Sequence, residues 1–226
     1  KTWYGWDWTG AEKSFQRAIE LNPGLSMSHC WYSFNLMFKG RIDEAVEEME
    51  KALQLDPLSV TINRNFGMVC FFARRYDRSL DASRRTLELD PSSVFVHLHL
   101  GEAYLGKSMY EEALAEFQSE KEVSKGSHGW AETFSAYVYI LMGNPAKAKA
   151  EQDTLLERSK RQYVSPFIVA CSHFVLGQYD EGFEWANKAY GECDPWLHYL
   201  MILPTLENLR LDPRYIDLLK KMNLDR

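Results

Sequence analysis

The chain has 226 residues, of which 46% are hydrophobic and 26% are charged, and its formal net charge is -6. This composition is typical of a globular protein with enough apolar residues for a core. No run approaches the roughly 18 uninterrupted apolar residues of a membrane helix. The acidic balance also disfavours nucleic-acid binding, which needs clustered Lys and Arg. We therefore expect no membrane insertion and no nucleic-acid partner.

The first ten residues, KTWYGWDWTG, contain neither an apolar signal region nor an initiator Met, so we expect a longer parent chain. Four aromatic residues lie in this stretch: Trp3, Tyr4, Trp6 and Trp8. We expect them to cover the exposed end of a helical stack. A partner site at this end is the alternative.

A fixed period runs along the chain. The phrase [EQ]-L-[ND]-P ends at Pro23, Pro57 and Pro91, each 34 residues after the last. Small residues recur in the same phase at Ala11, Ala45, Ser79, Ala113, Ala148 and Gly182, and a second set at Ser33, Gly67, Gly101, Ala136 and Ala170. Such a period indicates stacked structural repeats.

Each period reads as two helices of about 12 to 15 residues, because its apolar residues are spaced by three and four. The D-P and N-P pairs end the second helix, since the residue before Pro avoids helical geometry. Small residues let neighbouring helix axes approach closely, and large aromatic residues fill the remaining gaps. Asn144, before Pro145, is the expected N-cap of the second helix in its repeat.

These features resemble the tetratricopeptide repeat over roughly residues 5 to 192. The clearest copy is GEAYLGKSMYEEALAEF, with the family's characteristic residues at Gly101, Tyr104, Tyr110, Ala113 and Phe117. The resemblance implies an all-α, right-handed superhelical solenoid of antiparallel helix pairs. Departures occur at Lys125 and Lys160, which replace the closing Pro, and at Ser83 and Thr86, where Phe and Ala are usual.

We predict one solenoid domain over residues 1–226. It comprises a partial repeat at 1–25, full repeats at 26–59, 60–93, 94–127, 128–162 and 163–195, and a C-terminal cap at 196–226. Within the cap, Tyr215, Leu218, Leu219 and Met222 form an apolar stripe, whereas Asp217, Lys220 and Lys221 face water. A solenoid needs such a terminal element, with one apolar and one polar face.

Residues 161–223 also resemble the C-terminal end of repeat regions attached to bacterial or archaeal signalling proteins. The residues that carry this resemblance are Tyr163, Ser165, Pro166, Phe183, Trp185, Asp194, Pro195, Trp196, Leu209, Asp212, Pro213, Arg214, Tyr215, Leu218, Leu219, Met222 and Leu224. The family usually has Phe at the Tyr215 position. The resemblance implies a sensor or scaffold arm of a larger protein.

The resemblance further implies that the first helix of each pair lines a concave groove that binds an extended peptide or a partner helix. The predicted groove residues are Met27, Phe34, Met37, Phe38, Arg64, Met68, Phe71, Phe72, Leu98, Glu102, Trp130, Tyr137, Phe167 and Phe174. This lining is largely apolar, which favours a hydrophobic or amphipathic segment as partner. The alternative is that part of the set belongs to the core.

Two charged features have a structural and a functional interpretation. Arg64 is predicted to face Glu102 as an ion pair, or else a ligand carboxylate. The arginines of FFARRYDRSLDASRR are expected to be solvated and paired with nearby acids such as Glu47 and Glu50, with docking of an acidic partner or a phosphate as the alternative. A carboxylate clamp for C-terminal peptides is not predicted, because Phe34, Phe38, Met68 and Phe72 occupy its positions.

Catalytic, nucleotide-binding and metal-binding motifs are lacking, so we predict no enzyme activity and no cofactor or metal. The four cysteines form no C-x-x-C pair and are read as free thiols, the first three as buried hydrophobic residues. Free thiols favour a cytoplasmic location, with an extracytoplasmic one as the alternative. The predicted function is a protein-protein interaction scaffold of a prokaryotic signalling or regulatory protein. The alternatives are a homo-oligomerisation module, such as a homodimer, and a small-molecule sensor with a pocket between repeats.

Overall fold

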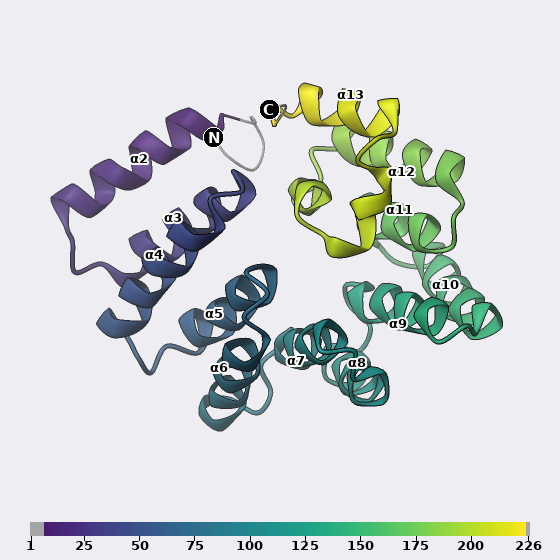
Figure 1. Cartoon of the computed structure of the whole chain (residues 1–226), viewed down its shortest axis with the longest axis horizontal. Helices are drawn as coiled ribbons and strands as arrows, with labels where there is room; N and C mark the ends of the chain where they lie inside the picture. The colour runs from purple at the N-terminus through teal and green to yellow at the C-terminus, as the bar shows by residue number, and fades with distance from the viewer. Residues whose placement is uncertain (1–6, 225–226) are drawn as a thin grey trace. The chain divides into compact units, whose positions relative to one another are not determined.

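The computed structural model describes residues 7–224, and within that range all regular structure is helical (Figure 1). Trp3, Tyr4 and Trp6, which we expected to cover one end of the stack, lie outside the described residues. The chain divides into two compact units, Lys1–Ser108 and Met109–Arg226. We call them unit 1 and unit 2 and describe each by itself.

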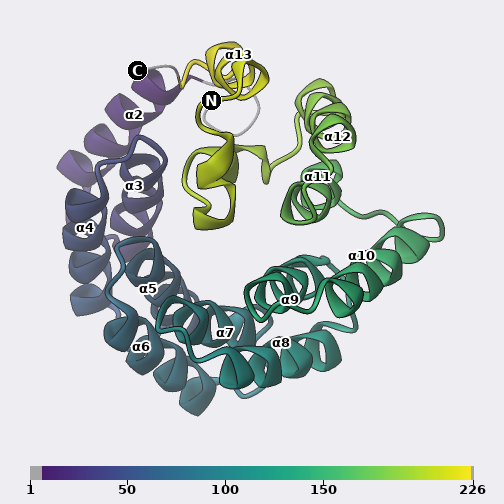
Figure 2. The same ribbon diagram turned by 45° about the vertical axis from the view of Figure 1, so that its right-hand side comes forward.

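Unit 1 contains α2 and two and a half further helix pairs. Its helices are α2 (Trp8–Leu21), α3 (Ser26–Phe38), α4 (Ile42–Leu55), α5 (Val60–Phe72), α6 (Tyr76–Leu89) and α7 (Val96–Gly106). We call the first helix of each repeat the A helix and the second the B helix. Figure 2 shows the A helices α3, α5 and α7 in one layer and the B helices α4 and α6 in the other.

The two layers differ in burial, as their sequences require. The A helix α3 is buried at nearly every position after Met27, whereas the B helix α4 buries only the stripe of Ala45, Val46, Met49 and Ala52. An A helix contacts its own B helix, the preceding B helix and its neighbouring A helices, so it needs apolar residues almost all round. A B helix keeps one charged face in solvent.

Small residues allow the two helices of a pair to approach closely, as predicted. The Ser33 hydroxyl donates to the Ala45 carbonyl at 2.6 Å, and the Ser79 hydroxyl donates to the Gly67 carbonyl at 2.7 Å. A Cβ atom on Gly67 would lie only 2.8 Å from Ser83 Oγ. The spacing of small residues therefore sets the distance between α5 and α6.

The turn from each A helix to its B helix uses one residue in the left-handed conformation. These residues are Gly40, Arg74, Ser108, Gly143 and Gly177, and their φ angles are 70°, 56°, 59°, 72° and 73°. The next residue donates its N–H back to the A helix, as Arg41 does to the Leu36 carbonyl at 2.9 Å and Arg75 to the Cys70 carbonyl at 2.8 Å. This bond pattern is the Schellman motif that ends many helices.

Unit 2 begins with α8 (Tyr110–Ser124), the B helix of the fourth repeat. It continues through α9 (Trp130–Leu141), α10 (Pro145–Ser159), α11 (Pro166–Val175) and α12 (Tyr179–Gly191), and ends with the 3-10 helices η1 (Leu197–Met201) and η2 (Pro204–Leu209) and α13 (Pro213–Lys221). The predicted N-cap is confirmed, since Asn144 Oδ1 accepts a hydrogen bond from the Lys147 N–H at 3.2 Å.

The predicted capping helix is present as α13. Tyr215, Leu218 and Met222 are buried, and Asp217 and Lys221 are exposed. Arg214 docks this helix on α12: its guanidinium lies 4.3 Å from the Phe183 ring centroid, and Nη1 donates to Asp180 at 2.7 Å. Burial raises the pKa of Tyr215.

The predicted all-α arrangement of stacked antiparallel helix pairs is therefore confirmed within each unit.

Candidate protein-binding faces

The A helices of unit 1 lie side by side and carry most of the predicted groove residues. Seven of these predicted residues are buried: Phe34, Met37, Phe38, Met68, Phe71, Leu98 and Glu102. Three are half-buried: Met27, Arg64 and Phe72. The alternative interpretation was that part of the predicted set belongs to the core. It is correct for buried side chains such as Met37, which has no exposed surface.

We call four of the accessible residues on α3 and α5 the unit-1 face: Met27, Trp31, Arg64 and Phe72. Trp31 is 38% exposed, and its ring centroid lies 5.5 Å from that of Phe34 in an edge-to-face arrangement. The sequence reading missed Trp31. Its position four residues after Met27 could have revealed it, because residues at i and i+4 share one side of a helix.

Arg64 supplies the cationic group of the unit-1 face. Its Nη1 donates to the Val94 carbonyl at 3.5 Å. Burial raises the pKa of the Cys30 thiol on the neighbouring helix α3, and the Arg64 charge opposes that rise. Glu102 lies 2.8 Å from His99 Nδ1, and its pairing with Arg64 stays a prediction.

The corresponding surface of unit 2 is covered by a later part of the same chain. We call residues 196–209 the tail segment, and Figure 1 draws it in yellow-green beside α11. The ring centroid of Trp130 on α9 lies 5.8 Å from Trp196, 6.2 Å from Tyr199 and 6.1 Å from Phe167 on α11. The predicted groove residue Trp130 thus meets both aromatic rings of the tail segment and the ring of Phe167.

The other two predicted groove residues of unit 2 have different surroundings. Tyr137 is half-buried; burial raises its pKa, and the Glu207 carboxylate of η2 raises it further. Phe174 packs on its own B helix, with its ring centroid 5.0 Å from that of Phe183, and a Cβ atom on Gly182 would lie 2.3 Å from its ring. Phe174 is therefore a core residue between α11 and α12.

The tail segment has a leucine at every third position: Leu197, Leu200, Leu203, Leu206 and Leu209, all of them buried. A 3-10 helix has three residues per turn, so this spacing keeps the leucines on one side of η1 and η2. The Tyr215 hydroxyl of α13 donates to the Leu200 carbonyl at 3.2 Å. From the sequence this stretch was assigned to the cap, and Trp196 and Leu209 to the resemblance with signalling proteins, but the period of three, although readable, was not used.

A buried carboxylate fixes the start of the tail segment. Asp194 is 1% exposed, and its Oδ2 accepts hydrogen bonds from Ser165 Oγ at 2.5 Å and from the Phe167 N–H at 3.1 Å. Its Oδ1 accepts from the Trp196 N–H at 2.9 Å. One side chain therefore joins the N-terminus of α11 to the first residue of the tail segment, and bonds to a charged acceptor are strong.

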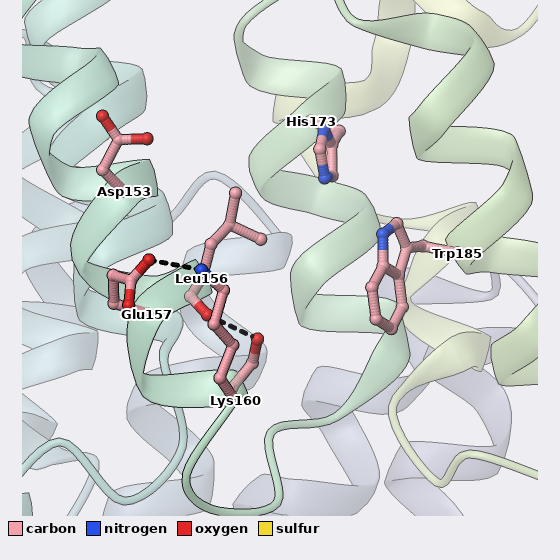
Figure 3. Close-up of a pocket in the computed structure, with 7 residues that line it drawn as sticks. Asp153, Leu156, Glu157, Lys160, His173 and Trp185 are labelled. Atoms are coloured by element: carbon pink, nitrogen blue, oxygen red, sulfur yellow. Dashed lines mark hydrogen bonds and ion pairs between the residues drawn. The ribbon is translucent and has the colours of Figure 1, made fainter.

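A pocket of about 540 Å³ lies between α10 and the α11–α12 pair (Figure 3). Trp185 and His173 line one side, and Leu156, Asp153, Glu157, Ser159 and Lys160 line the other. Asp153 pairs with Lys149 at 2.6 Å, and Glu157 pairs with Lys160. Both acids of the lining therefore pair with a lysine.

Two arginines of the α5–α6 region pair with acids on α4, and one of these acids is the predicted Glu50. Arg78 lies 2.7 Å from Glu50, and Arg75 lies 2.9 Å from Asp43.

Cys30, Cys70 and Cys171 are buried free thiols, and burial raises the pKa of Cys70 to about 11. Over residues 7–224, no helix is long and apolar enough to span a membrane. No group of three or more His, Cys, Asp or Glu side chains in that range could hold a metal ion.

Comparison with known proteins agrees with this geometry. The family model described as tetratricopeptide repeat matches residues 35–94 and 65–126. A search of curated proteins found no match. The central part of the chain therefore matches the tetratricopeptide-repeat family, and the helix pairs on either side of it have the same arrangement.

Several solved structures share the fold. PilW, a type IV pilus biogenesis factor, is 18% identical with a TM-score of 0.63, and the match covers 91% of each chain. TTC0263, a tetratricopeptide-repeat protein of Thermus thermophilus, is 20% identical with a TM-score of 0.60, over 86% of this chain and 99% of that one. MamA is 19% identical with a TM-score of 0.56, over 69% of this chain and 90% of that one. At these identities the likeness concerns the fold alone.

Proposed function

We propose that the chain is a protein-interaction scaffold that holds an extended peptide or a partner helix on the unit-1 face, as part of a larger signalling or regulatory protein. The observation that supports this proposal is the set of partly exposed apolar side chains on adjacent A helices, Met27 and Trp31 on α3 and Phe72 on α5. Accessible aromatic rings do not contribute to packing between stacked helices, and an exposed apolar surface of this kind is typical of a protein-binding site.

The chemistry of the unit-1 face defines the partner. Trp31 and Phe72 offer rings to apolar side chains of a bound segment, and Met27 offers an adaptable thioether. Arg64 provides a cation beside them, which favours a segment with a carboxylate near its apolar residues. Full burial of one apolar anchor contributes roughly 1.5 to 3 kcal/mol, and association and ordering offset much of that gain.

The test uses peptides selected from a displayed random library against the purified chain. Fluorescence anisotropy then measures their affinity for the wild type, for Phe72→Glu and for the control Leu58→Glu. Leu58 is 64% exposed in the turn before α5, so the control adds the same charge to the same unit away from the face. We expect Phe72→Glu to weaken binding at least about tenfold, roughly 1.4 kcal/mol, and Leu58→Glu to leave it unchanged.

Circular dichroism establishes first that both variants stay folded. Selected peptides that bind Phe72→Glu and the wild type equally would place recognition elsewhere and refute the unit-1 face as the binding site.

A further inference from the structure

We propose that the A-helix face of unit 2 is a second peptide-binding face, and that the tail segment is its resident ligand, exchangeable for a partner segment with two aromatic residues spaced three apart. This inference deepens the proposed function and rests on it, because both assign binding to the A helices. It adds the chemistry of the partner and the means by which the face is kept closed.

The repeat phase places the tail segment on binding positions. Trp130 occupies in its repeat the position that Met27 occupies in the second repeat, and Phe167 occupies the position of Arg64. Met27 and Arg64 belong to the unit-1 face, where both are partly accessible. In unit 2 the tail segment instead places the rings of Trp196 and Tyr199 against Trp130. The tail segment therefore covers Trp130, at the position that remains partly accessible as Met27 in unit 1.

The tail segment has the build of a bound peptide rather than of another repeat. It consists of two 3-10 helices of five and six residues, Leu197–Met201 and Pro204–Leu209. Such short turns have poorer hydrogen-bond geometry than α-helices, and the buried leucines hold the segment in place. Trp196 is itself only half-buried, so solvent reaches the edge of the contact.

The fit of the tail segment on α9 is incomplete at one atom. Trp130 is 3% exposed, and its indole N–H has no hydrogen-bond acceptor among the described residues. A buried donor without an acceptor is unfavourable. A partner segment that offers a carbonyl oxygen at this point would gain a hydrogen bond that the tail segment does not make, which gives an incoming segment an advantage over the resident one.

The connection at Asp194 gives the tail segment a point of release. Oδ2 of Asp194 binds the start of α11, and Oδ1 binds the Trp196 N–H. Cys193, directly before it, has a φ angle of 53°, in the left-handed region. Loss of this carboxylate would remove the hydrogen bonds that join the first turn of the tail segment to α11.

The test supplies the tail segment in trans. A dye-labelled peptide with the sequence of residues 194–211 is titrated into the wild type and into the double variant Trp196→Ala/Tyr199→Ala, in the full chain. We expect the variant to bind the peptide at least about tenfold more tightly than the wild type. The control Tyr163→Ala removes a 71% exposed ring from the same unit and should behave as the wild type. A peptide in which both aromatic residues are replaced by Ala should not bind the wild type, the double variant or the control variant.

Equal affinity of the peptide for the wild type and the folded double variant, or no binding to either, would make the tail segment a fixed structural element and overturn the proposal. If the double variant does not fold, hydrogen exchange of the wild type decides. Amides of η1 and η2 should then exchange faster than those of α9 and α11, and equal rates would overturn the proposal.

The two proposals fail separately. Peptides sensitive to Phe72→Glu would support the unit-1 face whatever the tail experiment gives. If Phe72→Glu does not weaken peptide binding but the double variant binds the tail peptide, peptide binding is confined to unit 2.

Discussion

At the scale of single residues, burial sets the charge state of His198 on η1. This side chain is 1% exposed, and burial lowers its pKa from 6.5 to about 3. The folded chain therefore keeps a neutral imidazole at pH values where the unfolded chain binds a proton. The contribution of the neutral, buried His198 side chain to the free energy of unfolding is fully present above pH 6.5, and it is lost as the pH falls toward 3.

We therefore expect the free energy of unfolding to decrease below pH 6.5 by up to about 1.4 kcal/mol per pH unit from this group. Urea unfolding at about pH 7 and about pH 5 measures the change, and His198→Gln should have the shallower dependence. The pKa values of carboxylates such as Glu12 and Asp212 are lowered from their ordinary values of 4.5 and 3.8, so these groups titrate mainly at pH values below this comparison. Identical pH dependence in the two proteins would show that His198 is not the responsible group.

Single residues also mark what the sequence could not reveal about the site. Met27, Arg64 and Phe72 were predicted on the groove and are accessible, but Phe34 and Met37 in the same pattern are buried. The repeat phase assigns a residue to one side of an A helix. It does not reveal how closely the neighbouring helix approaches, and that distance decides which side chains reach solvent.

At the scale of elements, the turn from the A to the B helix repeats with a left-handed residue, but only some copies have Gly. Ser108 has φ 59°, whereas Gly143 has φ 72° and a Cβ atom there would meet nothing within 4 Å. For residues other than Gly this conformation costs about 1 to 2 kcal/mol. Gly can therefore be placed at Ser108 and Ser at Gly143, and a side chain at Gly143 would meet no neighbouring atom within 4 Å.

Ser108→Gly should raise the free energy of unfolding by about 0.5 to 1 kcal/mol, because the backbone strain is removed while Gly adds some chain entropy. Gly143→Ser should lower it by a similar amount. Thermal unfolding of both variants checks the pair. A loss of stability in Ser108→Gly would mean that its side chain contributes more than the strain costs.

The elements with the helical period were predicted, whereas the 3-10 helices of the tail segment were not, although their leucine period is present in the sequence. The period of 34 residues placed the helix pairs, and Asn144 and the capping stripe of α13 were found from local patterns. The tail segment follows a period of three, which is neither the α-helical nor the strand pattern. Its position on α9 could not be read from the sequence either, since Trp130 and Trp196 are 66 residues apart.

At the scale of the whole molecule, stacked helix pairs leave the A helices as the surface on which repeats can act together. In each repeat the B helix is buried along one stripe, whereas the A helix is buried on almost all sides. The arrangement of the accessible groups on α3 and α5 therefore depends on how several repeats stack. Stability and binding in such stacks both depend on contacts between neighbouring repeats. Partner binding on A helices is therefore the central claim to test.

The most direct measurement is nuclear magnetic resonance of methionine methyl groups during titration with a peptide selected against the wild type. Met27 belongs to the unit-1 face and Met68 lies one helix away on α5, whereas Met49 is buried on the B helix α4 and Met142 is 42% exposed at the end of α9. We expect the Met27 and Met68 signals to shift and those of Met49 and Met142 to stay in place. Shifts at Met49 or Met142 without change at Met27 and Met68 would contradict binding on the unit-1 face.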